Sequence, residues 1–141
     1  MSLHPDITIR TADGRPLVAV EVKGIRDTSD AWAAQYRRNL IAHATWPTTL
    51  FLLVTPDRVY VWRPSEDSEP SERRPDRSLD AGSFWQELAG DLNREDLRGE
   101  AFELLVHSWL SALREQELPD GLRGLGLGEA LEMGEVRANA A

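Results

Sequence analysis

Lys23 is the only lysine in the chain, and the other fifteen basic residues are all arginine. It stands in the tripeptide Glu21-Val22-Lys23, two positions after a carboxylate. An ammonium is a compact charge whose proton affinity responds to its surroundings, whereas a guanidinium stays charged and spreads its donors in a plane. Such a group can orient a water molecule or neutralise negative charge on a substrate. Lys23 is therefore a candidate catalytic residue, set against the alternative that one lysine falls here by chance.

A predicted β-hairpin carries this tripeptide. Residues 6–11 alternate between polar and apolar side chains, and residues 17–23 are rich in β-branched side chains, so both segments are typical of strands. Between them Asp13-Gly14 is a strong signal for a two-residue type I′ turn. The turn predicts which residues of the two strands lie opposite each other.

With a two-residue loop, Ile9 faces Val18 and Ile7 faces Val20, and Asp6 becomes the direct neighbour of Glu21. Like charges in that position destabilise a pair of strands. Because side chains alternate along a strand, Lys23 lies on the same face as Glu21, and the valines of the second strand point to the other face. We expect Asp6, Glu21 and Lys23 to converge.

A divalent cation between the two carboxylates would resolve their repulsion. Mg²⁺ takes oxygen ligands, usually one or two carboxylates together with waters and substrate phosphates. A metal ion held in this way polarises a phosphoryl oxygen and lowers the pKa of a bound water. The chemistry suggested is hydrolysis of a phosphodiester with Mg²⁺, for which Mn²⁺ can substitute.

Pro5-Asp6, a 14-residue gap and then Glu21-Val22-Lys23 followed by a predicted helix resemble the PD-(D/E)xK nuclease superfamily, which has the restriction-endonuclease-like fold. The order of elements over residues 4–63, a hairpin, a helix and a second strand pair, is similar to the nuclease domain of type I restriction enzyme subunits and to the Uma2-like putative endonucleases. The resemblance covers a little under half of the chain.

The resemblance implies a role for each matching residue. Asp6 and Glu21 would bind the metal, with the carbonyl of Val22 as a further ligand, and Lys23 would assist the nucleophile. Related enzymes often carry Gln-x-x-x-Tyr in the next helix, where this chain has Gln35 but Asn39 in place of the tyrosine. Gln35 is thus a candidate catalytic residue that would form a hydrogen bond with the lysine, the water or a phosphate. The alternative is that it belongs to an ordinary polar helix face.

The family's core usually opens with a helix ahead of the Pro-Asp strand, and this helix often contributes another acidic residue. Only residues 1–4 precede Pro5 here. Either the chain is truncated at its N-terminus, or the amphipathic segment Glu100–Leu110 supplies that layer from the C-terminal side or from a second protomer.

The remaining pattern predicts an α/β fold, in which a mixed β-sheet with an antiparallel hairpin core is flanked by helices. A helix over residues 31–44 begins after Ser29 or Asp30 and ends at Trp46-Pro47. Residues 49–55 form a continuous apolar run, which indicates a strand covered on both faces. Residues 59–62 pair back after a turn, and such a sheet needs helices on both sides.

The chain divides into four predicted regions. Residues 1–64 form the nuclease-like core, and residues 65–80, rich in Ser, Pro and charge, read as a flexible acidic linker or loop. Residues 81–118 contain helices, about 82–90 and 94–115, that pack on the core or on a partner. Residues 119–141 are expected to be a loose tail.

Composition limits these interpretations. A chain of 141 residues, 41% of them hydrophobic, suits one domain with one core. It contains no cysteine, which excludes disulfides and thiolate chemistry. The sequence shows no apolar stretch long enough to span a membrane and no signal-peptide pattern. A cytoplasmic, bacterial setting fits best.

The net charge of −8 opposes binding to DNA, but it is unevenly distributed. Residues 4–64 carry eight basic and six acidic side chains, whereas residues 65–141 carry eight basic and eighteen acidic ones. DNA is the expected substrate, with an additional domain or a homo-oligomer needed for tight binding. The sequence leaves two readings open: a Mg²⁺-dependent nuclease domain, or a non-catalytic binding or assembly module with the same fold.

Overall fold

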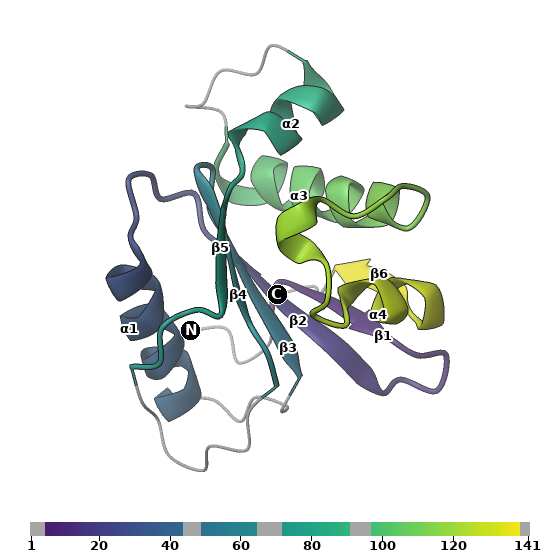
Figure 1. Ribbon diagram of the computed structural model, residues 1–141, viewed down its shortest axis with the longest axis horizontal. Coiled ribbons are helices and arrows are strands. Elements are labelled where there is room, and N and C mark those ends of the chain that lie inside the picture. Colours follow the sequence, from purple (N-terminus) through teal and green to yellow (C-terminus); the bar gives the residue numbers. More distant parts are fainter. Residues whose placement is uncertain (1–4, 44–48, 65–71, 91–96, 139–141) are drawn as a thin grey trace.

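The computed structural model describes residues 5–43, 49–64, 72–90 and 97–138, which form one mixed sheet with helices on both faces (Figure 1). The strands are β1 (Ile7–Arg10), β2 (Pro16–Val22), β3 (Leu50–Val54), β4 (Arg58–Trp62), β5 (Arg77–Asp80) and β6 (Glu135–Ala138). Their order in the sheet is β5-β4-β3-β2-β1-β6. Only β2 and β3 pair in parallel among the described strands. The predicted α/β class and mixed sheet are confirmed.

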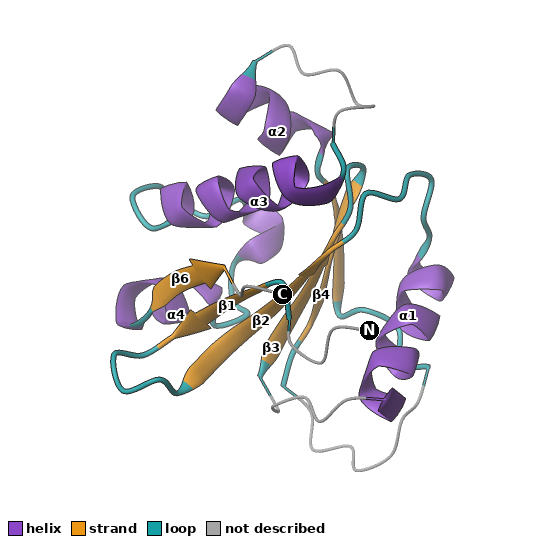
Figure 2. Ribbon diagram, turned by 180° about the vertical axis from the view of Figure 1, so that it is seen from behind, coloured by secondary structure: helices purple, strands orange, loops and turns teal. Residues whose placement is uncertain are grey.

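The helices are α1 (Asp30–His43), α2 (Gly82–Ala89), α3 (Gly99–Leu113) and α4 (Leu127–Met133), with a short 3-10 turn, η2, over Asp120–Leu122. Helix α1 connects the parallel strands β2 and β3 and covers one face of the sheet, while α3 and α4 cover the other (Figures 1 and 2). In the part of the chain that the structure describes, no helix is long and apolar enough to cross a membrane.

Strand β3 is buried along its whole length, as its continuous apolar run predicts. Its alternate side chains enter two separate cores. Phe51 and Leu53 join Ala33 of α1 on one face, whereas Leu50, Leu52 and Val54 join the larger core beneath α2, α3 and α4. The sheet is therefore a central layer between two helical layers.

The hairpin loop differs from the predicted two-residue turn. Gly14 donates its N–H to the carbonyl of Thr11 at 2.9 Å, and Thr11 donates to the carbonyl of Arg15 at 2.9 Å, so the loop has three residues, Ala12 to Gly14. Gly14 has a φ of +89°, a left-handed conformation that glycine adopts without a steric cost. The type I′ prediction is wrong because the Asp-Gly pair occupies the end of a longer turn.

The predicted register nevertheless holds in most of the hairpin. The longer loop leaves Arg10 opposite Pro16, one residue out of step, and an irregularity between Ile9 and Arg10 then shifts the pairing back. Ile9 lies opposite Val18 and Ile7 opposite Val20, as predicted. The bulge matters because a slip of one residue would exchange the two faces of β2.

Two predicted irregular regions are partly ordered secondary structure. The predicted linker, residues 65–80, contains strand β5 at its end, while residues 65–71 lie outside the described residues. The predicted loose tail contains η2, α4 and β6, and four of its leucines are buried in the larger core: Leu122, Leu125, Leu127 and Leu131. Both segments were predicted to be irregular because they are rich in glycine and polar residues. The leucines of the C-terminal segment, which are buried in the fold, were given too little weight.

The other boundaries shift only slightly. Helix α1 spans residues 30–43 where 31–44 was predicted, and its expected stop at Trp46-Pro47 lies outside the described residues. The predicted helix over 94–115 is described from Gly99 to Leu113. Such differences are within the usual fraying of helix ends.

Candidate functional site

The sheet brings the three predicted residues to one end of the hairpin. Asp6 immediately precedes β1, Glu21 lies on β2, and Lys23 follows the last residue of β2. Val18, Val20 and Val22 belong to the larger core, whereas Ala19 belongs to the core under α1. Alternation along the strand then places Glu21 and Lys23 on one face, opposite the valines as predicted, and this is the face that α1 covers.

A backbone hydrogen bond fixes the carboxylate of Asp6. Its Oδ2 accepts the N–H of Val22 at 2.8 Å. The N–H and C=O of one residue in a strand point to the same side, so the Val22 carbonyl is directed toward the same edge as Asp6. Lys23 turns its own N–H the other way, toward the Val54 carbonyl at 2.9 Å. The Val22 carbonyl is therefore directed to the side where the Asp6 carboxylate lies.

Glu21 is 5% exposed, and its carboxyl group lies in an unfavourable environment. Burial raises the pKa of Glu21 to about 9, assisted by a hydrogen bond with Asp6, by the charge of Asp6 and, to a lesser extent, by Glu103, while Lys23 acts in the opposite direction. A carboxylate in such surroundings holds a proton at neutral pH unless another cation replaces it.

Helix α3 supplies a third carboxylate that sequence reasoning missed. Burial, the charge of Asp6 and a hydrogen bond with Asp6 raise the pKa of Glu103, with a further contribution from Glu100. The sequence predicts that the segment Glu100–Leu110 covers the core from the C-terminal side or from a second protomer, and α3 packs on the sheet of the same chain. The apolar stripe of α3 predicted that the helix packs on the sheet. Which of its acidic residues faces Asp6 depends on the rotation of the helix about its axis, which the sequence does not give.

Gly24 sets how closely α3 approaches this site. A Cβ at Gly24 would lie 2.9 Å from the Cα of Arg98, just before the first residue of α3. Only glycine lets the chain leaving β2 contact the start of α3 so closely. Lys23 directly precedes Gly24, and Glu103 lies five residues after Arg98, so this close contact helps to set the distance of α3 from the site.

Tyr36 of α1 is the partner that the structure gives to Lys23. The Lys23 Nζ lies 5.6 Å from the centre of the Tyr36 ring. Burial acts to lower the pKa of Lys23, but hydrogen bonding with Tyr36 and the charges of Tyr36, Glu21 and Asp6 outweigh it, and the pKa lies above its usual value. Burial in turn raises the pKa of Tyr36. Lys23 is therefore a stable cation in this site.

Gln35 is exposed to solvent. Its side chain is exposed on α1, as is that of Asn39, whereas Tyr36 is partly buried. Gln35 was predicted from the spacing of the family motif, which does not define the rotation of α1. The rotation in the structure turns Tyr36, the next residue, toward the sheet. An apolar stripe of Trp32, Tyr36 and Leu40 packed against the core carried the signal that would have found Tyr36.

The chemistry of these donors fits a hard divalent cation. Among the described residues no three or more histidine, aspartate or glutamate side chains are grouped closely enough to hold a metal ion by themselves. Asp6 and Glu21 nevertheless provide two mutually repelling carboxylates, which match the one or two that Mg²⁺ commonly takes from a protein. Mg²⁺ completes its shell with water and phosphate oxygens, so a third protein carboxylate is not required.

Comparisons of the chain with protein-family models, with curated proteins and with solved structures found no match.

Proposed function

We propose that this chain is a Mg²⁺-dependent nuclease domain of the restriction-endonuclease-like kind, which hydrolyses phosphodiester bonds of DNA. The observation that supports it most is the meeting of Asp6, Glu21 and Lys23 with Glu103 from a distant helix. A structural ion pair would need one acid for one lysine. Here Asp6 interacts with both Glu21 and Glu103, and a divalent ion would take the place of the proton that Glu21 otherwise holds at neutral pH.

Each residue has a distinct part in this proposal. Asp6 and Glu21, with the Val22 carbonyl, would hold the metal ion, and Glu103 would add negative charge or bond a coordinated water. A bound Mg²⁺ supplies Lewis-acid polarisation of the phosphodiester and a water of lowered pKa. Asp6 is already oriented by the Val22 N–H, so little reorganisation is needed before a cation binds.

Lys23 would act as a cation rather than as a base. Its raised pKa keeps the ammonium protonated at neutral pH, so it does not accept a proton from water. It is suited to holding a hydroxide or a phosphate oxygen in line and to neutralising charge that grows in the transition state. Tyr36 restricts where the ammonium can lie, because it packs beside the Lys23 head group.

The experiment is a cleavage assay on supercoiled and single-stranded DNA with Mg²⁺ or Mn²⁺. Wild type is expected to nick or degrade DNA and to stop when a chelator is added. Lys23→Ala should lose about 10²–10³ in rate, while Arg15→Ala, which removes an exposed cation at the far end of the same hairpin, should match wild type. Equal trace activity in wild type and Lys23→Ala would indicate contamination, and the chain would then be a non-catalytic binding or assembly module.

A further inference from the structure

A groove of about 310 Å³ lies between α2 and the C-terminal half of α3, away from the carboxylate site. Its lining is mixed, and the apolar part comes from Phe84 and Leu88 of α2, from Trp109 and Leu113 of α3, and from Pro119. A volume of this size is at the lower end of the range for ligand pockets, and it accommodates about one or two large side chains.

The walls of this α2–α3 groove are held in place by aromatic packing. Phe84 stacks on Trp109 with ring centres 5.3 Å apart, and Trp85 meets Trp109 edge-on at 5.4 Å. The Trp85 indole also donates to the Pro56 carbonyl at 3.0 Å, which ties α2 to the turn before β4. The groove is therefore preformed, and binding a ligand there costs little reorganisation.

Leu88 contributes a partly exposed apolar side chain to the groove. It is 37% exposed near the end of α2, and its side chain lines the groove. A single exposed leucine is ordinary on a protein surface, but this one lines the groove together with Phe84 and Trp109 and adds to its apolar patch. The patch offers an apolar side chain of another molecule a place to be buried.

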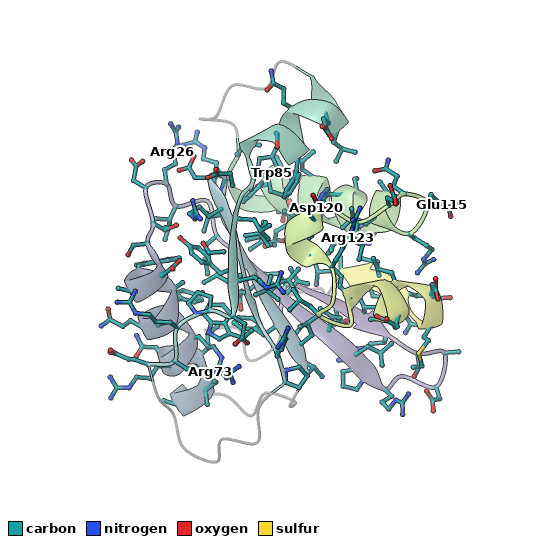
Figure 3. All side chains as sticks on the ribbon, viewed as in Figure 1. Arg26, Arg73, Trp85, Glu115, Asp120 and Arg123 are labelled. Carbon is teal, nitrogen blue, oxygen red and sulfur yellow. The ribbon has the colours of Figure 1, made fainter. Side chains whose placement is uncertain are left out.

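The rim of the groove is acidic. Of the described residues that line it, Glu87 and Glu117 are charged, and none is basic. Arg114 turns its guanidinium toward the carbonyls of Leu131 and Gly134. Arg123 lies beside Asp120, with which it pairs at 3.0 Å (Figure 3), and it reaches Glu117 only at 3.8 Å. The rim keeps a net negative charge.

We infer that the α2–α3 groove binds a basic amphipathic segment of a partner protein. One bulky apolar side chain of that segment enters between α2 and α3, and flanking Arg or Lys residues meet Glu87 and Glu117. Nucleic acids and anionic lipid surfaces carry negative charge, which the acidic rim repels. A second copy of this chain, at a net charge of −8, is likewise repelled.

The test uses a displayed library of random 12-residue peptides, selected on the full chain and counter-selected on Ala112→Trp, which fills the groove. Enriched peptides are expected to share a Trp, Phe or Leu flanked by Lys or Arg. Synthetic peptides from the selection should bind wild type with a Kd that rises with salt, because exposed charges are screened. Circular dichroism and melting confirm that Ala112→Trp folds.

Two surface variants test the contacts without disturbing the core. Leu88→Ser and Glu87→Lys should each weaken peptide binding by about tenfold. Their matched controls lie on α4. Met133→Ser removes an exposed apolar side chain, and Glu129→Lys reverses an exposed charge. Both control variants should bind the peptides as tightly as wild type does.

Three results would overturn the inference. One is a selection that enriches no basic apolar sequence over the filled variant, and another is binding that Leu88→Ser and Glu87→Lys leave unchanged. The third is a dimer of the chain alone, detected by sedimentation and removed by Leu88→Ser, which would assign the groove to a second copy. The outcome does not depend on DNA cleavage, so failure here leaves the proposed nuclease function untouched.

Discussion

The two faces of strand β2 meet opposite environments, although their residues alternate along one short segment. On one face Val18, Val20 and Val22 pack into the larger core. On the other face Ala19 packs under α1, and the next two positions on that face carry Glu21 and Lys23. The valine face stabilises the strand, whereas the charged face holds a buried acid in poor surroundings.

This contrast separates the residues that form the fold from those that would form a site. Apolar burial contributes roughly 25 cal/mol for each Å² removed from water, so the valine face supplies stability. A buried acid with a pKa of about 9 reduces stability at neutral and alkaline pH. Strained or electrostatically unfavourable groups persist where the surrounding structure determines their position, and they are concentrated at functional sites.

The largest effect is expected from placing a charge on the valine face. Val20 is fully buried, so Val20→Asp puts an unpaired carboxylate into the core and should cost about 3–5 kcal/mol of the free energy of unfolding. Urea unfolding followed by circular dichroism measures it. Stability within about 1 kcal/mol of wild type would show that the two faces are not as different as the packing indicates.

The next effect concerns the cation on the charged face. Lys23→Arg keeps the charge but has a bulkier planar head, which cannot lie at the same point beside Tyr36 and the carboxylates. Turnover on DNA should fall by about 10²-fold, the usual result of misplacing a catalytic group by roughly 1 Å, while Mn²⁺ affinity changes little. Undiminished cleavage would refute a specific catalytic role for Lys23.

A smaller effect is expected on stability when the acid is neutralised. The pKa of Glu21 is about 9 in the folded chain and 4.5 by its ordinary value, so the folded state binds more protons between these values. The free energy of unfolding then falls as pH rises through that window, and the loss is complete above it. Glu21→Gln avoids the loss.

The measurement compares urea unfolding of wild type and Glu21→Gln from pH 5 to pH 9. The variant should become relatively more stable by at least about 1 kcal/mol over that range. Glu129→Gln, which changes an exposed carboxylate on α4, is the control and should show no widening. A constant difference between wild type and Glu21→Gln would mean that Glu21 is not perturbed.

The smallest effect concerns the hydroxyl of Tyr36. Tyr36→Phe keeps the ring near the Lys23 ammonium but removes the hydrogen-bonding group, so cleavage should slow by about fivefold, equivalent to about 1 kcal/mol. Tyr60→Phe is the matched control, because its hydroxyl bonds Thr28 at 2.6 Å instead of the lysine. Equal rates for the two variants would remove Tyr36 from the site.

Local patterns predicted the hairpin, the buried strand β3 and the convergence of Asp6, Glu21 and Lys23. Strand alternation alone decides which of these side chains share a face, so they could be placed before the fold was known. The register survived a wrong turn assignment because the apolar residues Ile7 and Ile9 must face the valines, and the bulge accommodates this requirement.

The contributions from distant elements could not be predicted in the same way. Glu103 reaches Asp6 only because α3 packs on the sheet with one particular rotation, which the Gly24 contact helps to determine. Tyr36 rather than Gln35 faces Lys23 for the same kind of reason, a rotation of α1. The C-terminal segment was expected to be loose because its glycines obscured leucines that are buried only in the complete fold.

The most direct measurement is a calorimetric titration of Mn²⁺ into wild type and Asp6→Asn at pH 7, in two buffers with different ionisation enthalpies. Wild type should bind Mn²⁺ and release a proton, since a cation that occupies the site displaces the proton that Glu21 holds below its pKa of about 9. Asp6→Asn should bind at least about tenfold more weakly, a change of about 1.4 kcal/mol. Wild-type binding without proton release, or equal affinity in Asp6→Asn, would contradict a metal site between Asp6 and Glu21.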